Sequence, residues 1–300
     1  MGRRLRIFRV NAFTDTACAG NPACVVLDGE SLDEPAMLAL TRELGGVDVA
    51  FVLPPDGIDG DLKVRFFTPR AETGLVGHAT VAVHAVLDAL GRPPARRQQQ
   101  RGGIVEIERL SDAEGALYGF SQPLPPRPGP LPGEQLTAIL SALDLDTEAL
   151  DPQLPAVVAG IGGNRALIGL RSGTSLVKVR PDLQRLAALS AAGCPTGYFL
   201  YSVAPAIADC DSEARMFCPA LGFPEDPVSG NAHALLAAHF SARGRFRDRL
   251  CAGLYTGRQG HHMGRPGMLT VRLTEQIAGS EQVRVAGRAR IVFEATLDFG

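Results

Sequence analysis

The sequence predicts an α+β fold built from two similar halves, and three observations support this. The chain has 300 residues, which suits two domains of about 150 residues each. Apolar residues form 45% and charged residues 21% of the chain, as in ordinary globular proteins. A motif at Arg65 recurs at Arg215, and similar elements follow each copy. We therefore expect two related units, each containing strands and helices.

The recurring motif consists of a strand, a loop, a glycine and an apolar helix. Arg65-Phe-Phe-Thr-Pro69 is echoed by Arg215-Met-Phe-Cys-Pro219, and apolar runs with helical periodicity then begin at Gly77 and Gly230. Residue type, order and spacing are kept through the whole motif. We interpret the match as a true internal repeat, which ties the two halves together.

The N-terminal half is expected to open with a β-hairpin. Residues 4–13 alternate as a strand, Gly20-Asn21-Pro22 marks a turn, and residues 23–27 form the partner strand. A helix follows, for which Ser31 and Glu34 fit a capping box. Further elements in this half are strands at 47–53 and 63–68 and a helix at 79–90.

A proline-rich stretch separates the halves, because residues 122–133 contain six prolines. The predicted domains are residues 1–121, a linker at 122–134 and residues 135–284, and residues 285–300 return to the first half as a strand. Within the second half we expect helices at 134–148, 181–192 and 231–243 and strands at 156–170, 197–204, 212–218 and 269–274.

Charge and composition favour a small-molecule partner. The net charge of -2 and pI near 6.3 give no overall attraction to nucleic acid or to anionic membranes. The basic residues 96–101 lack interleaved aromatics and are expected to form a solvated loop. No signal-peptide stretch or membrane-spanning apolar run is present in the sequence, so a cytoplasmic location is expected. Six cysteines without CxxC spacing are expected to be reduced thiols.

The chemistry is expected at the two helix starts. Gly77 and Gly230 fall where the apolar helices begin, and free N–H groups at a helix start attract anions. Such groups could hold a substrate carboxylate, or stabilise negative charge that develops on a neighbouring carbon. The polar residues beside these glycines are His78, Asp226, Ser229 and Asn231. Histidines six apart on each helix do not share a face, so no metal site is expected.

These motifs, with Asn11-Ala-Phe, Glu225-Asp-Pro-Val-Ser-Gly230 and Gln259-Gly, resemble the phenazine-biosynthesis PhzF-like family, relatives of diaminopimelate epimerase and proline racemase. The resemblance implies two halves, each a mixed sheet or barrel wrapped around a central helix, with the active site in the cleft between them. It also implies a homodimer that uses no metal or organic cofactor.

The resemblance also implies roles for individual residues. The best-known member moves a proton between ring carbons of a dihydro-hydroxyanthranilate. Its proton-carrying glutamate corresponds to Asp48, its His and Asp partners to His78 and Asp226, and its Gly-Ser pair to Gly230-Asn231. Aspartate is one methylene shorter than glutamate, and the amide of Asn231 both donates and accepts, so substrate selection is expected to differ.

The leading hypothesis is a cofactor-independent isomerase that transfers a proton on a small carboxylate-bearing metabolite. Asp48, His78 and Asp226 are the predicted catalytic residues, and the predicted substrate-binding residues are Gly77, Ser229, Gly230 and Asn231. From the strand pattern alone, Asp48 would also fit an exposed strand face, and Ser229 would fit a simple helix cap. Two alternatives stay open: an amino-acid racemase or epimerase, and a non-catalytic binding protein.

Overall fold

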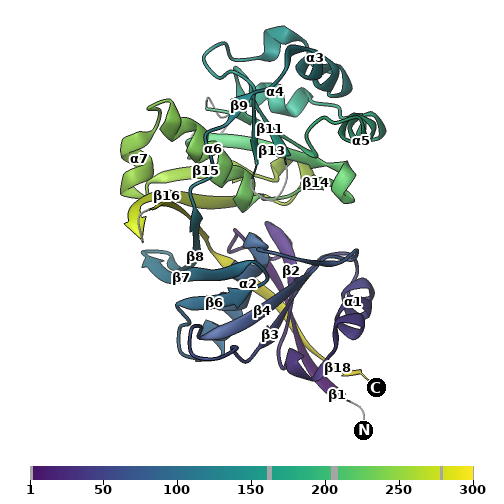
Figure 1. The fold of residues 1–300 in the computed structure, drawn as a ribbon, viewed down its shortest axis with the longest axis vertical. Coiled ribbons are helices and arrows are strands. Elements are labelled where there is room, and N and C mark those ends of the chain that lie inside the picture. Colours follow the sequence, from purple (N-terminus) through teal and green to yellow (C-terminus); the bar gives the residue numbers. More distant parts are fainter. Residues whose placement is uncertain (1–2, 161–163, 204–208, 278–279, 300) are drawn as a thin grey trace. The chain divides into compact units, whose positions relative to one another are not determined.

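The computed structural model describes residues 3–160, 164–203, 209–277 and 280–299. The chain divides into two compact units, here called unit 1 (Met1–Gln122 with Arg284–Gly300) and unit 2 (Pro123–Val283). Unit 1 contains both ends of the chain, and β18 (Ala289–Phe299) pairs antiparallel with β1 (Arg3–Ala12). Figure 1 shows yellow β18 beside purple β1. The predicted boundaries of the linker stay a prediction.

Unit 1 begins with the expected hairpin of β1 and β2 (Asn21–Val26). The turn needs glycine at position 20, because φ there is 57° and a side chain would collide with the carbonyl of Ala12. The other elements are η1 (Gly29–Ser31), α1 (Glu34–Glu43), β3 (Asp48–Leu53), β4 (Leu62–Phe67), β5 (Glu72–Thr73), α2 (Gly77–Ala89), β6 (Arg97–Gln100), β7 (Gly103–Asp112) and β8 (Gly115–Pro123).

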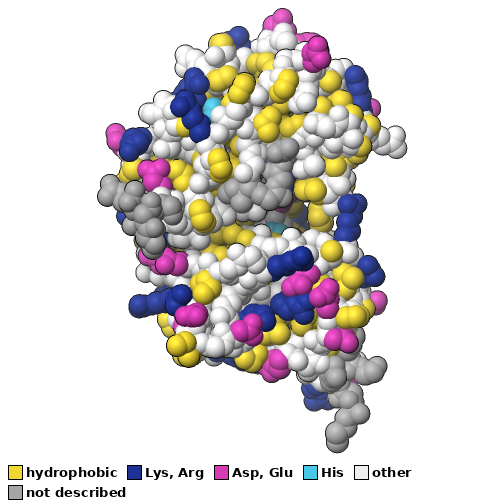
Figure 2. Space-filling view, viewed as in Figure 1, with side chains coloured by type: hydrophobic (Ala, Val, Ile, Leu, Met, Phe, Trp, Pro, Cys, Tyr) yellow, Lys and Arg dark blue, Asp and Glu magenta, His cyan; other side chains and the backbone are white. Residues whose placement is uncertain are grey.

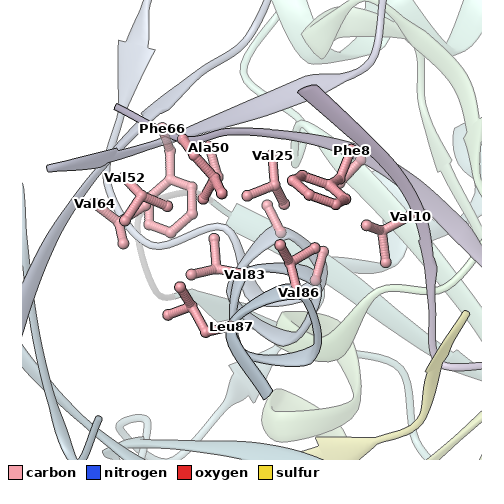
Figure 3. Close-up of a cluster of buried hydrophobic side chains, with 14 of the residues drawn as sticks. Phe8, Val10, Val25, Ala50, Val52, Val64, Phe66, Val83, Val86 and Leu87 are labelled. Carbon is pink, nitrogen blue, oxygen red and sulfur yellow. The ribbon is translucent and has the colours of Figure 1, made fainter. Parts of the chain in front are cut away.

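The strands of unit 1 pack against the buried helix α2. In Figure 3, side chains such as Phe8, Val25 and Phe66 point from the strands towards Val83 and Val86 of the helix. These side chains are at most 3% exposed, and burial of each contributes about 1.5–3 kcal/mol. The helix is therefore held along its length, and its first residues are fixed relative to β3.

The first helix is capped differently from the prediction. The capping box of Ser31 and Glu34 is wrong: Ser31 ends the short helix η1, and Asp33 is the N-cap of α1. Asp33 Oδ1 accepts a hydrogen bond from the backbone N–H of Ala36 at 3.0 Å. A carboxylate is an equally good cap, and Pro35 in the first turn suits a helix that starts after Asp33.

Unit 2 repeats this plan around α6 (Gly230–Ala242). Its other elements are β9 (Gly129–Pro130), α3 (Gly133–Ala142), η2 (Thr147–Ala149), β10 (Val157–Gly160), β11 (Asn164–Gly169), α4 (Gly173–Lys178), α5 (Leu183–Ala191), β12 (Gly197–Ser202), β13 (Ser212–Cys218), η3 (Pro219–Leu221), β14 (Phe223–Asp226), α7 (Arg247–Ala252), β15 (Tyr255–Gln259), η4 (His261–Met263) and β16 (Gly267–Ile277). Strand β17 (Ser280–Gly287) runs from unit 2 into unit 1 and pairs with β8.

The register of the strands confirms two similar halves. Val49 pairs with Phe67 in unit 1, and Tyr198 pairs with Phe217 in unit 2. The next rungs also match, because Phe67 pairs with Glu72 where Phe217 pairs with Glu225. The helices α2 and α6 that follow are both 13 residues long. The fold is α+β, with a mixed sheet around one central helix in each half.

Three segments differ from the sequence predictions. The helix predicted at 134–148 ends at Ala142 as α3, and the separate short helix η2 follows. The predicted loop at 96–101 contains β6, in which Gln98 is fully buried and lies 3.0 Å from the ring of His84. A polar side chain can be buried in this strand because it has that partner. The predicted strand at 156–170 is two strands, β10 and β11, paired antiparallel. Residues 161–163 between them lie outside the described residues.

The surface carries both signs of charge. Figure 2 shows basic and acidic side chains interspersed over the face drawn, in keeping with the small net charge. Within the described ranges, no helix is long and apolar enough to cross a membrane. None of the six cysteines, all of which lie in the described ranges, forms a disulfide.

Candidate active site

A largely buried ion pair stabilises each copy of the repeat. In unit 2, Arg215 forms a bidentate pair with Glu225 at 2.9 and 2.8 Å, and the two side chains are 9% and 12% exposed. In unit 1, Arg65 forms the same pair with Glu72 at 2.8 and 2.7 Å. Each guanidinium also lies over the ring of the phenylalanine two residues later. These pairs fix the strands that lead to both helix starts.

Asp48 and His78 meet in unit 1. Asp48 is the first residue of β3, His78 is the second residue of α2, and Asp48 Oδ2 lies 3.5 Å from His78 Nε2. Both side chains are only 14% exposed. The alternative that Asp48 lies on an exposed strand face is therefore wrong. Strand β2 pairs with β3 in parallel, and α2 is buried against the strands. This packing brings the Asp48 carboxyl group and the His78 imidazole together.

Burial favours the neutral imidazole form of His78. Burial lowers its pKa from 6.5 to about 4. A neutral imidazole has one N–H donor and one bare nitrogen, so it can both give and accept a proton. The Asp48–His78 pair thus combines a carboxyl with a group that can relay or position a proton beside it.

The start of α2 packs closely against the ring of Phe120. No side chain of the described residues caps it, and the first helical hydrogen bond runs from the Thr80 N–H to the Val76 carbonyl. The earlier N–H groups of Gly77 and His78 therefore precede the helical ladder. A Cβ on Gly77 would lie 2.6 Å from Phe120 Cζ, so only glycine fits here. This helix start can stabilise negative charge beside Asp48.

The remaining predicted site residues lie together in unit 2. Asp226 ends β14, and Ser229 is the N-cap of α6, with Oγ accepting from the Ala232 N–H at 3.4 Å. The capping role of Ser229 is thereby confirmed. Gly230 and Asn231 open α6. Among the described residues, the buried Oδ1 of Asn231 has no protein hydrogen-bond partner, so it is an acceptor suited to a ligand O–H or N–H.

The two units carry different charges at equivalent rungs. Asp48 pairs with Ala23 in unit 1, and Gly197 pairs with Arg165 in unit 2. A Cβ on Gly197 would lie 2.6 Å from Arg165 Cδ, so the Arg165 side chain crosses the place where unit 1 has its acid. Burial lowers the pKa of Arg165, and the charge of Asp226 opposes that shift. Only unit 1 therefore has an acid at this rung.

Sequence reasoning gave no role to Gln259, the last residue of β15. Its side chain is 1% exposed and bonds to the backbone of the loop between Asp226 and Ser229. The Gln-Gly motif was the only signal, and it did not show the contact. Among the described residues, no group of three or more His, Cys, Asp or Glu side chains could hold a metal ion.

Comparisons with known proteins agree with this architecture. Residues 10–295 match the family of phenazine biosynthesis-like proteins. A protein of Escherichia coli K12 named as an uncharacterized isomerase, YddE, is 35% identical over 97% of both chains. The trans-2,3-dihydro-3-hydroxyanthranilate isomerase of Pseudomonas chlororaphis is 27% identical over 93% of this chain and 94% of that one.

A solved structure shows the same fold. The crystal structure of the Bacillus anthracis phenazine biosynthesis protein of the PhzF family matches with a TM-score of 0.85 at 23% identity, covering 98% of this chain and 99% of that one. The family match spans nearly the whole chain, and the repeat, the two helix starts and the strand register lie within it. This chain belongs to the phenazine biosynthesis-like (PhzF) protein family.

Proposed function

We propose that this protein is an isomerase that moves a proton between two carbons of a small carboxylate-bearing metabolite, without a metal or an organic cofactor. The observation that carries the proposal is the contact of Asp48 with His78 beside the uncapped start of α2. The relatives named as isomerases support the reaction class.

In the proposed reaction, the Asp48 carboxylate takes a proton from a carbon near the substrate carboxyl group. The electron pair left on the substrate shifts through its double bonds, and the N–H groups of Gly77 and His78 stabilise the negative charge. The protonated Asp48 then returns this proton to a different carbon, with His78 beside it positioning the carboxyl group. The enzyme regains its starting protonation state, so protons and electrons balance.

We further propose that the residues of unit 2 bind the substrate and orient it. Gly230 offers backbone N–H groups to a carboxylate, and the Asn231 amide suits a hydroxyl or amino group. Asp226 is proposed to position or protonate the substrate, while Ser229 holds the helix start in shape. The P. chlororaphis relative makes trans-2,3-dihydro-3-hydroxyanthranilate the first substrate to test.

Turnover by Asp48 variants tests the proposal. Asp48→Asn and Asp48→Ala are expected to lose at least about 10²-fold in kcat, because they lack the proton-accepting carboxylate. Asp88→Asn is the control, since Asp88 bonds to Tyr118 and Arg109 near the other end of α2. Normal turnover by Asp48→Ala would refute the role of Asp48.

The alternatives have separate readouts. A racemase or epimerase would invert single centres in a panel of amino and hydroxy acids, which a chiral chromatography assay detects. A binding protein would hold a ligand tightly by calorimetry and show no proton exchange with solvent. We also propose a homodimer, which sedimentation velocity of the full chain tests.

A further inference from the structure

Gln259 bridges both ends of the loop that carries Asp226. Its Nε2 donates to the backbone carbonyl of Asp226 at 2.6 Å, and its Oε1 accepts from the backbone N–H of Ser229 at 3.1 Å. The side chain is 1% exposed, so water does not compete well for these bonds. One amide thus fixes the residue before the loop and the residue that caps α6.

The surroundings of Gln259 leave little room for movement. Gly260 has φ of 87°, and a Cβ there would lie 2.8 Å from the Pro227 carbonyl. The ring of His233 packs against Gly257, where a Cβ would lie 2.4 Å from the ring. Burial lowers the pKa of His233 to about 4, and its interaction with Gln259 opposes that shift. The backbone on both sides of Gln259 is therefore tightly packed, which holds its side chain in place.

Unit 1 provides an internal comparison. Lys63, two residues before the repeated arginine of unit 1, pairs with Gln99. Glu213, two residues before the repeated arginine of unit 2, pairs with Arg258. Gln100 is therefore the register equivalent of Gln259. Its Oε1 accepts from Gln98 at 3.1 Å, within its own strand. The same residue type at the same rung makes a local contact in one unit and a contact to the loop in the other.

We propose that Gln259 is a positioning residue: it holds the loop from Asp226 to Ser229 so that the Asp226 carboxyl and the first N–H groups of α6 face the substrate in one geometry. This inference rests on the proposed function for its effect on turnover. The geometry of the loop itself is independent of the reaction.

The chemistry of the bridge requires an amide. Ionised glutamate has acceptors only, so in Gln259→Glu the bond to the Asp226 carbonyl becomes a contact between two acceptors. Protonated glutamate has one O–H donor and one carbonyl acceptor and restores both bonds. Activity of Gln259→Glu is therefore expected to rise towards the wild-type value as the pH falls through the pKa of the new carboxyl group.

Three variants test the proposal: Gln259→Met, Gln259→Glu and the control Gln100→Met. Gln259→Met is expected to lose about 10²-fold in kcat with a smaller change in KM, because a displaced loop misplaces the reacting groups. Hydrogen exchange of the Ser229 amide, measured by NMR, should accelerate at least about tenfold, since 1.4 kcal/mol of lost protection is a factor of ten. Gln100→Met should change neither value.

The outcomes separate this inference from the proposed function. Unchanged Ser229 exchange in Gln259→Met, or a Gln259→Glu activity whose pH profile is that of the wild type, overturns the positioning role. If the wild type shows no isomerase activity, the proposed function fails, and the exchange of Ser229 still decides whether Gln259 holds the loop. If Gln259→Met does not fold, Gln259→Glu at acidic and neutral pH provides both readouts.

Discussion

Buried histidines on the two central helices should make the fold sensitive to acid. Burial lowers the pKa values of His78, His84 and His233 from 6.5 to about 4. Each histidine is therefore neutral in the folded chain at a pH where the unfolded chain begins to bind protons. The free energy of unfolding should fall as the pH falls from about 6.5 to about 4, and should be insensitive to these groups above that range.

His84 gives the cleanest test of this effect. One proton per histidine changes the free energy of unfolding by about 1.4 kcal/mol per pH unit, so the full shift is worth about 3 kcal/mol. Solvent screens this effect little, because His84 is only 5% exposed. His84 Nε2 lies 3.0 Å from Gln98 Oε1. In His84→Gln, the new side-chain amide is expected to donate to the same oxygen. The substitution should therefore remove the proton while keeping a hydrogen bond.

Urea unfolding followed by circular dichroism, between pH about 7 and about 4.5, measures the effect. The unfolding free energy of the wild type should decrease more steeply towards acid than that of His84→Gln, by about 1.4 kcal/mol per pH unit. Parallel curves for the two proteins would refute the reasoning. A wild type whose stability does not fall below pH about 6 would refute it as well.

The other predictions concern the ion pairs and the start of α2. Glu225→Gln should destabilise the fold by about 3 kcal/mol, because it leaves the buried guanidinium of Arg215 without its carboxylate partner. Glu72→Gln should cost about 1 kcal/mol, since its arginine keeps a second carboxylate; equal shifts in Tm would contradict this. Gly77→Ala should cost about 1–3 kcal/mol through its clash with Phe120, whereas Gly129→Ala, which has open space, should have the wild-type Tm.

Periodicity predicts much of this fold because most elements bury one apolar face. The alternation of residues 289–297 predicts a strand, and in the structure this strand, β18, pairs with β1. The repeat also predicts both helix starts to within two residues. Local patterns suffice where burial itself determines the structure.

Other features depend on contacts between residues far apart in the sequence. The polar strand β6 is buried only because Gln98 meets His84, and the sequence shows no pattern for that pair. Gln259 reaches a carbonyl 33 residues away. The start of β3 likewise became a candidate site through the resemblance, and only the structure shows Asp48 beside His78. Such side-chain contacts cannot be read from periodicity.

Asp48 is proposed to carry the proton in the isomerase reaction. The most direct test is the deuterium content of product formed in D2O from trans-2,3-dihydro-3-hydroxyanthranilate, measured by mass spectrometry and NMR. A protonated Asp48 that exchanges with solvent before it returns the proton should place deuterium on the carbon that receives the proton, and Asp48→Asn should place none. Incorporation by Asp48→Asn at the wild-type rate would contradict the account.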